Sequence, residues 1–258
     1  MIKPLRKNSR RLRRGVYLLP SLFTFGNIIL GFYAVIRGLR GDFQTAAVLV
    51  YIAGFLDTLD GRIARMTGTE SDFGREFDSL ADVLTFGAAP ALLAHFWGLR
   101  HFGRLGWLIP LFYLLCATTR LARFNVQTRS VDSRFFVGLP VPAAAATLVS
   151  LVYFIPPQHL DLWPDVLMMA GLILTGILMV STFRYFSFKQ LDLTQRWSYR
   201  NAVLLGVLLL LIAYDPPAVF FSAAIIYTLA GPIGWLVRRL VHQQSPAKDI
   251  PTERKIGG

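Results

Sequence analysis

Residues 43–98 read FQTAAVLVYIAGFLDTLDGRIARMTGTESDFGREFDSLADVLTFGAAPALLAHFWG. Two apolar blocks, 43–61 and 77–98, flank a polar stretch that contains several Arg and Gly residues. Each block has about the 20 residues that an α-helix needs to cross the hydrocarbon core of a bilayer. Acidic residues nevertheless occur in both blocks, at the ends that adjoin the polar stretch. The pattern predicts two neighbouring membrane helices that carry a polar site where they join.

The whole chain has the same apolar character. Of its 258 residues, 54% are hydrophobic and only 16% are charged, and the mean hydropathy is +0.49. Because soluble domains carry about 25% charged residues, this composition excludes a large soluble domain and a disordered chain. The single cysteine, Cys116, excludes an intramolecular disulfide and a cysteine-rich metal site.

Apolar segments of membrane-spanning character recur along the sequence. We find eight of them, at 18–36, 43–61, 77–98, 106–124, 138–156, 165–183, 201–214 and 217–237. The seventh is the shortest, and prolines lie at several of the joins, where helices commonly end. We therefore expect an all-α polytopic membrane protein with about eight transmembrane helices.

The basic residues predict how these helices are oriented. If the N-terminus is cytoplasmic, four of the 27 Lys and Arg residues lie outside and 23 lie inside; the four are Arg37, Arg40, Arg100 and Arg104. Cytoplasmic loops are enriched in Lys and Arg, so we expect a multi-pass protein of the cell membrane with both termini and the acidic site on the cytoplasmic side. The net charge of +12 suits anionic lipid. No recognisable nucleic-acid-binding module accompanies it, so no nucleic-acid partner is expected.

The acidic residues in the two blocks are spaced for a common site. Asp57 and Asp60 are three residues apart, and Asp78 and Asp82 are four apart, so each pair shares one helical face. Four carboxylates a few ångströms apart cannot all stay ionised without a counter-charge. Oxygen ligands without nearby Cys or His favour a hard cation such as Mg²⁺, Mn²⁺ or Ca²⁺. The alternative is that these residues only cap helices or pair with the arginines between them.

From Asp57 to Asp82 the sequence fits the pattern D-x2-D-G-x2-A-R-x8-G-x3-D-x3-D. This pattern resembles the signature of the CDP-alcohol phosphotransferases. Further stretches resemble the phosphatidylserine synthases of that family: LPSLFTFGN (19–27), DFGREFDSLADVLTFGAAPALL (72–93), RLARFNV (120–126), FVGLPVPAAA (136–145) and RYFSFK (184–189).

The resemblance implies a division of the chain into four parts. We expect a basic cytoplasmic arm at 1–17, a six-helix catalytic membrane core at 18–190, additional transmembrane helices at 191–237 and a polar cytoplasmic tail at 238–258. It also implies transfer of a phosphatidyl group from CDP-diacylglycerol to the hydroxyl of L-serine, with release of CMP, in phospholipid biosynthesis. One or two divalent ions, Mg²⁺ or Mn²⁺, and a homodimer follow from the same resemblance.

The resemblance also assigns roles to individual residues. The expected metal ligands are Asp57, Asp60, Asp78 and Asp82, and Asp82 is also the expected catalytic base. The expected CDP-binding residues are Thr24, Asp57, Gly61, Ala64, Arg65 and Gly74. The candidates for serine binding are Arg120, Arg123, Asn125, Arg184 and Lys189, and any of the basic ones can instead be an ordinary cytoplasmic charge.

Two other functions remain open at this stage. The first is the same chemistry with another acceptor, glycerol 3-phosphate or inositol phosphate. The second is a cation transporter that uses the four carboxylates as an ion site, although it does not explain the Gly, Ala and Arg positions of the pattern. Metal-dependent release of CMP from CDP-diacylglycerol distinguishes the enzyme from the transporter.

Overall fold

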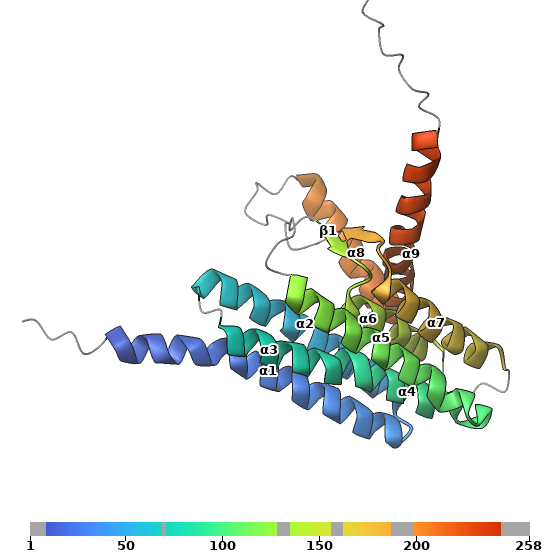
Figure 1. Cartoon of the computed structure of the whole chain (residues 1–258), viewed down its shortest axis with the longest axis horizontal. Coiled ribbons are helices and arrows are strands. Elements are labelled where there is room, and N and C mark those ends of the chain that lie inside the picture. The colour runs from blue at the N-terminus through green and yellow to red at the C-terminus, as the bar shows by residue number, and fades with distance from the viewer. Residues whose placement is uncertain (1–8, 69–70, 128–134, 156–161, 187–198, 244–258) are drawn as a thin grey trace, which may run out of the picture.

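The computed structural model describes residues 9–68, 71–127, 135–155, 162–186 and 199–243, most of which are helical. The α-helices are α1 (Ser9–Leu39), α2 (Phe43–Thr67), α3 (Asp72–Asp82), α4 (Ala89–Trp97), α5 (Leu105–Gln127), α6 (Val141–Phe154), α7 (Trp163–Val180), α8 (Tyr199–Tyr214) and α9 (Pro216–Gln243). A π-helix, η1 (Val83–Ala88), joins α3 to α4, and a 3-10 helix, η2 (Leu99–Phe102), precedes α5. Figure 1 shows α1 to α7 gathered in one bundle, from which α8 and α9 extend.

All eight predicted apolar segments correspond to helical structure, so the expected all-α fold is confirmed. The third segment consists of α3, η1 and α4 in direct succession. Five stretches within the described residues are long and apolar enough to cross a membrane: Leu22–Leu39, Asp72–Trp97, Leu105–Val126, Trp163–Val180 and Pro216–Val237. Two shorter helical stretches, in α6 and α8, are also apolar. The chain is therefore a multi-pass membrane protein, and the number of eight crossings stays a prediction.

The turn between α1 and α2 is held by Asp42. Its carboxylate accepts a hydrogen bond from the backbone N–H of Thr45 (3.1 Å) and forms an ion pair with Arg37. Gly41 precedes it with φ of +80°, a conformation that glycine adopts without strain. The hydroxyl and backbone N–H of Thr45 and the charge of Arg37 hold the pKa of Asp42 below its ordinary value. Asp42 thus caps α2 and sets the antiparallel packing of α1 against α2.

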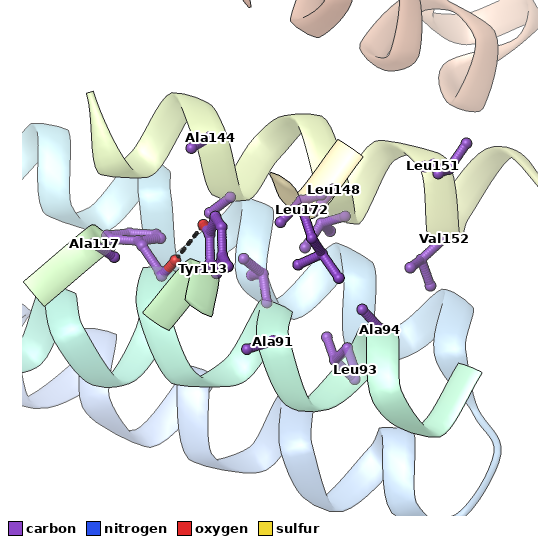
Figure 2. Packing of buried hydrophobic residues seen from close by; sticks show 14 of the residues in the cluster. Ala91, Leu93, Ala94, Tyr113, Ala117, Ala144, Leu148, Leu151, Val152 and Leu172 are labelled. Atoms are coloured by element: carbon purple, nitrogen blue, oxygen red, sulfur yellow. Dashed lines mark hydrogen bonds between the residues drawn. The ribbon is translucent and has the colours of Figure 1, made fainter. Parts of the chain in front are cut away.

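Small residues let the helices of the bundle approach closely. Ala91 and Ala94 on α4, Ala117 on α5 and Ala144 on α6 are buried together with larger side chains such as Leu148 (Figure 2). On α1, Gly31 lies against Thr85 and Gly38 lies against Leu93, and a methyl group at either glycine would collide with these neighbours. Membrane helices pack through such small residues because lipid offers no hydrophobic driving force for their association.

A short antiparallel ribbon departs from the purely helical expectation. β1 (Phe135–Val137) pairs with β2 (Arg184–Phe186), and these strands join the ends of helices that are distant in sequence. The buried hydroxyl of Tyr185 donates a hydrogen bond to the carbonyl of Thr228 (3.0 Å) and so ties the ribbon to α9. Strands of three residues are too short to leave a periodic pattern in the sequence, which is why the ribbon was not predicted.

Candidate active site

Three of the four predicted metal ligands come together between the second half of α2 and the second half of α3. Ligand oxygens of Asp57, Asp60 and Asp78 all lie within 4.8 Å of one another. Asp60 is 4% exposed, and the other two are half-buried. Helix α1 packs against both α2 and α3, and it therefore holds the two acidic faces in register.

This cluster has the chemistry of a divalent cation site. Three carboxylates so close to one another repel unless a counter-charge lies among them. All of the donors are oxygen atoms, which hard cations such as Mg²⁺, Mn²⁺ and Ca²⁺ prefer. The residues present therefore fit a divalent cation, and the carboxylates alone do not select among these ions.

Thr24, predicted to contact CDP, lies directly against the cluster. Its hydroxyl donates a hydrogen bond to Oδ2 of Asp60 (3.3 Å), and both residues are buried. A bond of this kind orients a carboxylate that serves as a metal ligand. The structure thus gives Thr24 a contact within the protein, and its contact with nucleotide stays a prediction.

Asp82 ends α3 one turn beyond Asp78 and lies outside the group of three. Its carboxyl group is within hydrogen-bonding reach of that of Asp57. Its Oδ1 atom is buried and has no hydrogen-bond partner among the described residues. The structure therefore places Asp82 next to the cluster with one oxygen available for a further interaction, as a catalytic base requires.

The π-helix η1 begins directly after Asp82 and is held from two sides. The hydroxyl of Thr85 donates a hydrogen bond to the backbone oxygen of Asn27 on α1 (3.2 Å). The hydroxyl of Tyr113 on α5 donates one to the backbone oxygen of Phe86 (2.8 Å; Figure 2). Single π-turns inside α-helices are frequent at functional sites, and this one adjoins the carboxylate proposed for catalysis.

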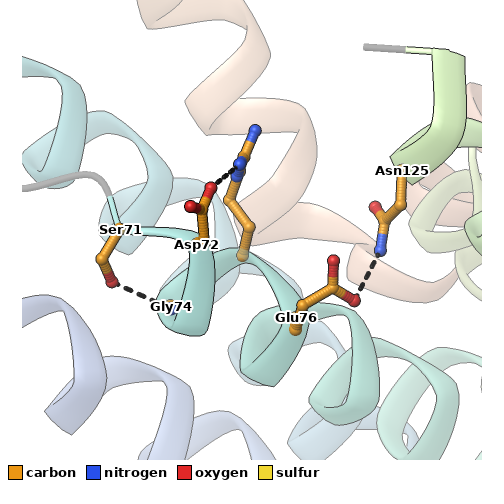
Figure 3. A network of polar contacts seen from close by, with 6 residues as sticks. Ser71, Asp72, Gly74, Glu76 and Asn125 are labelled. Carbon is orange, nitrogen blue, oxygen red and sulfur yellow. Dashed lines mark hydrogen bonds and ion pairs between the residues drawn. The ribbon is translucent and has the colours of Figure 1, made fainter. Parts of the chain in front are cut away.

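The N-terminal turn of α3 precedes the acidic residues on the same helix and is held by polar contacts (Figure 3). The hydroxyl of Ser71 accepts a hydrogen bond from the backbone N–H of Gly74 (3.0 Å) and caps the helix. A methyl group at Gly74 would lie only 3.0 Å from that hydroxyl oxygen. One turn later the side-chain amide of Asn125 donates a hydrogen bond to Glu76 (3.3 Å) and so connects α5 to α3. The predicted CDP contact of Gly74 therefore coincides with a position that already favours glycine.

The remaining predicted CDP residues lie along the end of α2. Gly61 follows Asp60 directly, and Ala64 and Arg65 follow within the next two turns. Gly61 is half-buried, whereas the side chains of Ala64 and Arg65 are outside the described part of the structure. The roles of all three in CDP binding remain predictions.

The side chains of three of the five candidates for serine binding are described, and the structure gives them different surroundings. Arg120 is 8% exposed, stacks over the ring of Phe124 at 5.5 Å and interacts electrostatically with Asp82. Arg123 is exposed, and Asn125 donates hydrogen bonds to Ser79 and Glu76. The structure does not describe the side chain of Arg184, which starts β2, and it does not describe Lys189. Arg120 is thus the candidate that the described structure brings to the carboxylates.

Two residues near the site were not among the predicted site residues. Asn27 is fully buried on α1, one turn after Thr24. Tyr227 comes from α9 and interacts electrostatically with Arg120. The three-residue spacing between Thr24 and Asn27 was a readable signal, because it places both on one face of α1. No such signal exists for Tyr227, which is positioned by the packing of α9 against α6 and β2.

Comparison with known proteins defines the class of this protein. The model of the CDP-alcohol phosphatidyltransferase family matches residues 17–179, which include all four carboxylates of the site. The chain belongs to this family.

Curated relatives extend the similarity beyond the family core. A protein of Helicobacter pylori (strain ATCC 700392 / 26695) is 38% identical over 222 residues, which are 86% of this chain and 92% of the relative. A protein of Bacillus subtilis (strain 168) is 34% identical over 172 residues, 67% of this chain and 92% of the relative. Both relatives are named CDP-diacylglycerol–serine O-phosphatidyltransferase. The resemblance noticed in the sequence is thereby confirmed.

Proposed function

We propose that this protein is a phosphatidylserine synthase, which transfers the phosphatidyl group of CDP-diacylglycerol to the hydroxyl of L-serine and releases CMP. The observation that carries the proposal is the convergence of Asp57, Asp60 and Asp78 within 4.8 Å, in a chain that carries the complete family signature. The names of the relatives supply the choice of serine as acceptor.

The carboxylate cluster accounts for recognition of the donor. A diphosphate is strongly anionic and would be repelled by three carboxylates alone. Asp57, Asp60 and Asp78 would hold a divalent cation, which would supply positive charge to offset the diphosphate and the leaving group. Thr24 holds the carboxylate of Asp60 in place, and we assign Gly61, Ala64, Arg65 and Gly74 to the CDP moiety on the basis of the family pattern.

Asp82 accounts for activation of the acceptor. In the proposed reaction the carboxylate of Asp82 takes the proton of the serine hydroxyl as the serine oxygen bonds to the phosphorus next to diacylglycerol. The bond between that phosphorus and the oxygen of CMP breaks, and CMP leaves with the electron pair. The available Oδ1 atom of Asp82 supports this role, since a general base must contact the proton that it removes.

Arg120 is the side chain that best explains an amino-acid acceptor. A guanidinium binds a carboxylate through two parallel hydrogen bonds. Arg120 is buried and interacts electrostatically with Asp82, so in this proposal a serine whose carboxylate is bound to Arg120 would place its hydroxyl near the base. The exposed Arg123 has no comparable position. We further propose that the site faces the cytoplasm and that the chain forms a homodimer, on the grounds of the charge distribution and of the family resemblance respectively.

The experiment is a CMP-release assay on the purified protein with CDP-diacylglycerol as donor. L-serine, glycerol 3-phosphate, inositol phosphate and no acceptor are compared side by side, and the lipid product is identified by mass. We expect serine-dependent CMP release and phosphatidylserine. Preferential turnover with another acceptor would retain the reaction class and overturn the choice of serine. If the protein instead carried divalent cations across liposome membranes and released no CMP, the transporter hypothesis would replace the enzyme hypothesis.

A further inference from the structure

Resting on the proposed function, we infer that Asn27 binds the acceptor hydroxyl and presents it to Asp82. The inference assigns a site residue to α1 that faces the carboxylates of α2 and α3. It depends on where Asn27 lies, on the bonds that its side chain leaves unmade, and on the chemistry of the attacking oxygen.

Contacts between α1 and the α3–η1 segment show which turn of α3 lies level with Asn27. The rings of Phe25 and Phe77 lie 5.1 Å apart, and two turns further Gly31 lies against Thr85. Both contacts join residues in the same order, so the two segments run in parallel. Asn27 lies between these contacts, and its own backbone oxygen accepts a hydrogen bond from Thr85. It is therefore level with the last turn of α3.

Contacts between α1 and α2 likewise show which turn of α2 lies level with Asn27. Thr24 donates its hydrogen bond to Asp60, and the side chain of Leu56 packs next to Gly26. The order of these contacts is reversed, as expected for antiparallel helices. Asn27 follows both on α1 and is therefore level with the turn of α2 that precedes Asp60.

These two placements bring Asn27 to the level at which Asp57 and Asp82 meet. The last turn of α3 contains Asp82, and the turn of α2 before Asp60 contains Asp57. The carboxyl groups of Asp57 and Asp82 are within hydrogen-bonding reach of each other. Asn27 is thus level with the inner end of the carboxylate cluster, one turn deeper than Thr24.

The side chain of Asn27 leaves its hydrogen bonds unmade. It is 0% exposed, and neither Nδ2 nor Oδ1 has a partner among the described residues. Most buried polar side chains are hydrogen-bonded, because removing an amide from water without compensation is costly. The Oδ1 atom of Asp82, in the turn of α3 that is level with Asn27, is also buried without a hydrogen-bond partner among the described residues. A ligand with one polar group that both donates and accepts would satisfy the two residues together.

A hydroxyl group is such a ligand, since it offers one donor and two acceptor positions. In the inferred arrangement Nδ2 of Asn27 donates to the acceptor oxygen, and the hydroxyl proton points to Oδ1 of Asp82. The proton moves to Asp82 while the oxygen–phosphorus bond forms and the bond to CMP breaks. The amide keeps its protons throughout, so Asn27 orients the nucleophile and takes no part in proton transfer.

The test uses Asn27→Leu, which has a similar size and cannot form hydrogen bonds. We expect kcat/KM for serine to fall about 3- to 10-fold, the loss expected for one hydrogen bond. The melting temperature and the affinity for CDP-diacylglycerol should stay near the parent values, because no bond within the protein is lost. Thr175→Val is the matched control. It removes a fully buried hydroxyl from α7, and it should leave the kinetics with serine unchanged.

The outcomes separate this inference from the proposed function. A parent protein without serine-dependent CMP release would refute the function and the inference together. An active parent and an Asn27→Leu variant with unchanged kcat and KM would refute the inference alone. A variant with equal losses of melting temperature, donor binding and rate would show a structural role and would also refute it. If the leucine variant does not fold, Asn27→Ala is measured in the same way.

Discussion

The hydroxyl of Tyr113 on α5 donates a hydrogen bond to the backbone oxygen of Phe86, 2.8 Å away, within the π-helix that follows Asp82. A π-turn is wider than an α-turn and departs from the regular ladder of backbone hydrogen bonds. Because buried carbonyls need partners, the phenol supports this departure from a neighbouring helix. The segment that directly follows Asp82 is therefore supported by Tyr113, a residue of the next long helix.

Tyr113→Phe should destabilise the protein and slow catalysis. The variant leaves the carbonyl of Phe86 buried with one partner fewer, which should lower the free energy of unfolding by about 1–3 kcal/mol. Relaxation of the π-helix should also displace Asp82 and lower kcat. The measurements are thermal unfolding in detergent and single-turnover rates. Tyr214→Phe, at a position that is 90% exposed, serves as the control and should change neither. An unchanged rate in a destabilised Tyr113→Phe variant would separate the π-helix from catalysis.

The sequence predicts the helices and the acidic cluster because both depend on local spacing. Apolar blocks of membrane-spanning length mark the helices, and three- and four-residue intervals place Asp57 with Asp60 and Asp78 with Asp82. The π-helix is different, because its bonds come from Tyr113 and Thr85 through tertiary packing. Such contacts between residues distant in sequence cannot be predicted from the local conformational preferences of the chain.

The arginines show a second limit of sequence reasoning. Arg120 and Arg123 count equally in the charge distribution that predicts orientation. The structure buries Arg120, which interacts electrostatically with Asp82, and leaves Arg123 exposed. A count of charges records the side of the membrane on which a residue lies, whereas the direction of its side chain is set by helix packing. The contribution of Tyr227 from α9 is likewise a matter of packing alone.

The carboxylate cluster predicts a dependence on divalent metal. Asp57→Asn and Asp78→Asn should each remove nearly all activity and weaken metal binding, because each deletes one charged ligand from a group of three. Isothermal titration with Mg²⁺ or Mn²⁺ measures the affinity, and CMP release measures the activity. Asp72→Asn is the control, since Asp72 is exposed and paired with Arg75 outside the cluster. Full turnover of the parent protein in EDTA would contradict the metal site.

The charge distribution predicts the orientation in the membrane. In a Cys116→Ala background, a cysteine at Glu70 should be protected in intact cells from an impermeant thiol reagent, whereas a cysteine at Arg104 should react. Arg104 is exposed in the turn before α5, on the side predicted to be external, and provides the matched control. Labelling of both positions after permeabilisation shows that each is accessible. The reverse pattern in intact cells would invert the topology.

The cap of α2 predicts a pH-dependent contribution to stability. The folded pKa of Asp42 is lowered by its bonds to Thr45 and by the charge of Arg37, so its ionised form favours the folded state. This stability is present above the unfolded pKa of about 3.9 and is lost as the pH falls toward the folded pKa. Asp42→Asn retains a capping side chain and removes the charge. The difference in melting temperature between parent and variant should therefore be largest near neutral pH and shrink below about pH 4. A difference independent of pH would exclude this contribution.

Asp82→Asn tests whether Asp82 acts in chemistry or in metal binding. The substitution keeps the size and one carbonyl oxygen of the side chain but removes its basicity. Because a positioned general base contributes about 10²–10⁴-fold to a rate, kcat should fall by a factor in that range. The affinity for CDP-diacylglycerol should change little, since Asp82 lies outside the group of three carboxylates that share a site.

Direct binding of CDP-diacylglycerol and single-turnover rates, measured side by side for parent and Asp82→Asn, distinguish the two roles. A base gives a slow variant that still binds donor and metal. A metal ligand gives a variant in which rate, donor affinity and metal affinity fall together, as Asp78→Asn should. The contact between Asp82 and Asp57 makes this comparison necessary, because a second cation between these two carboxylates would also satisfy their charge. Intact catalysis in Asp82→Asn would exclude both roles and leave the buried Oδ1 atom without a function in the reaction.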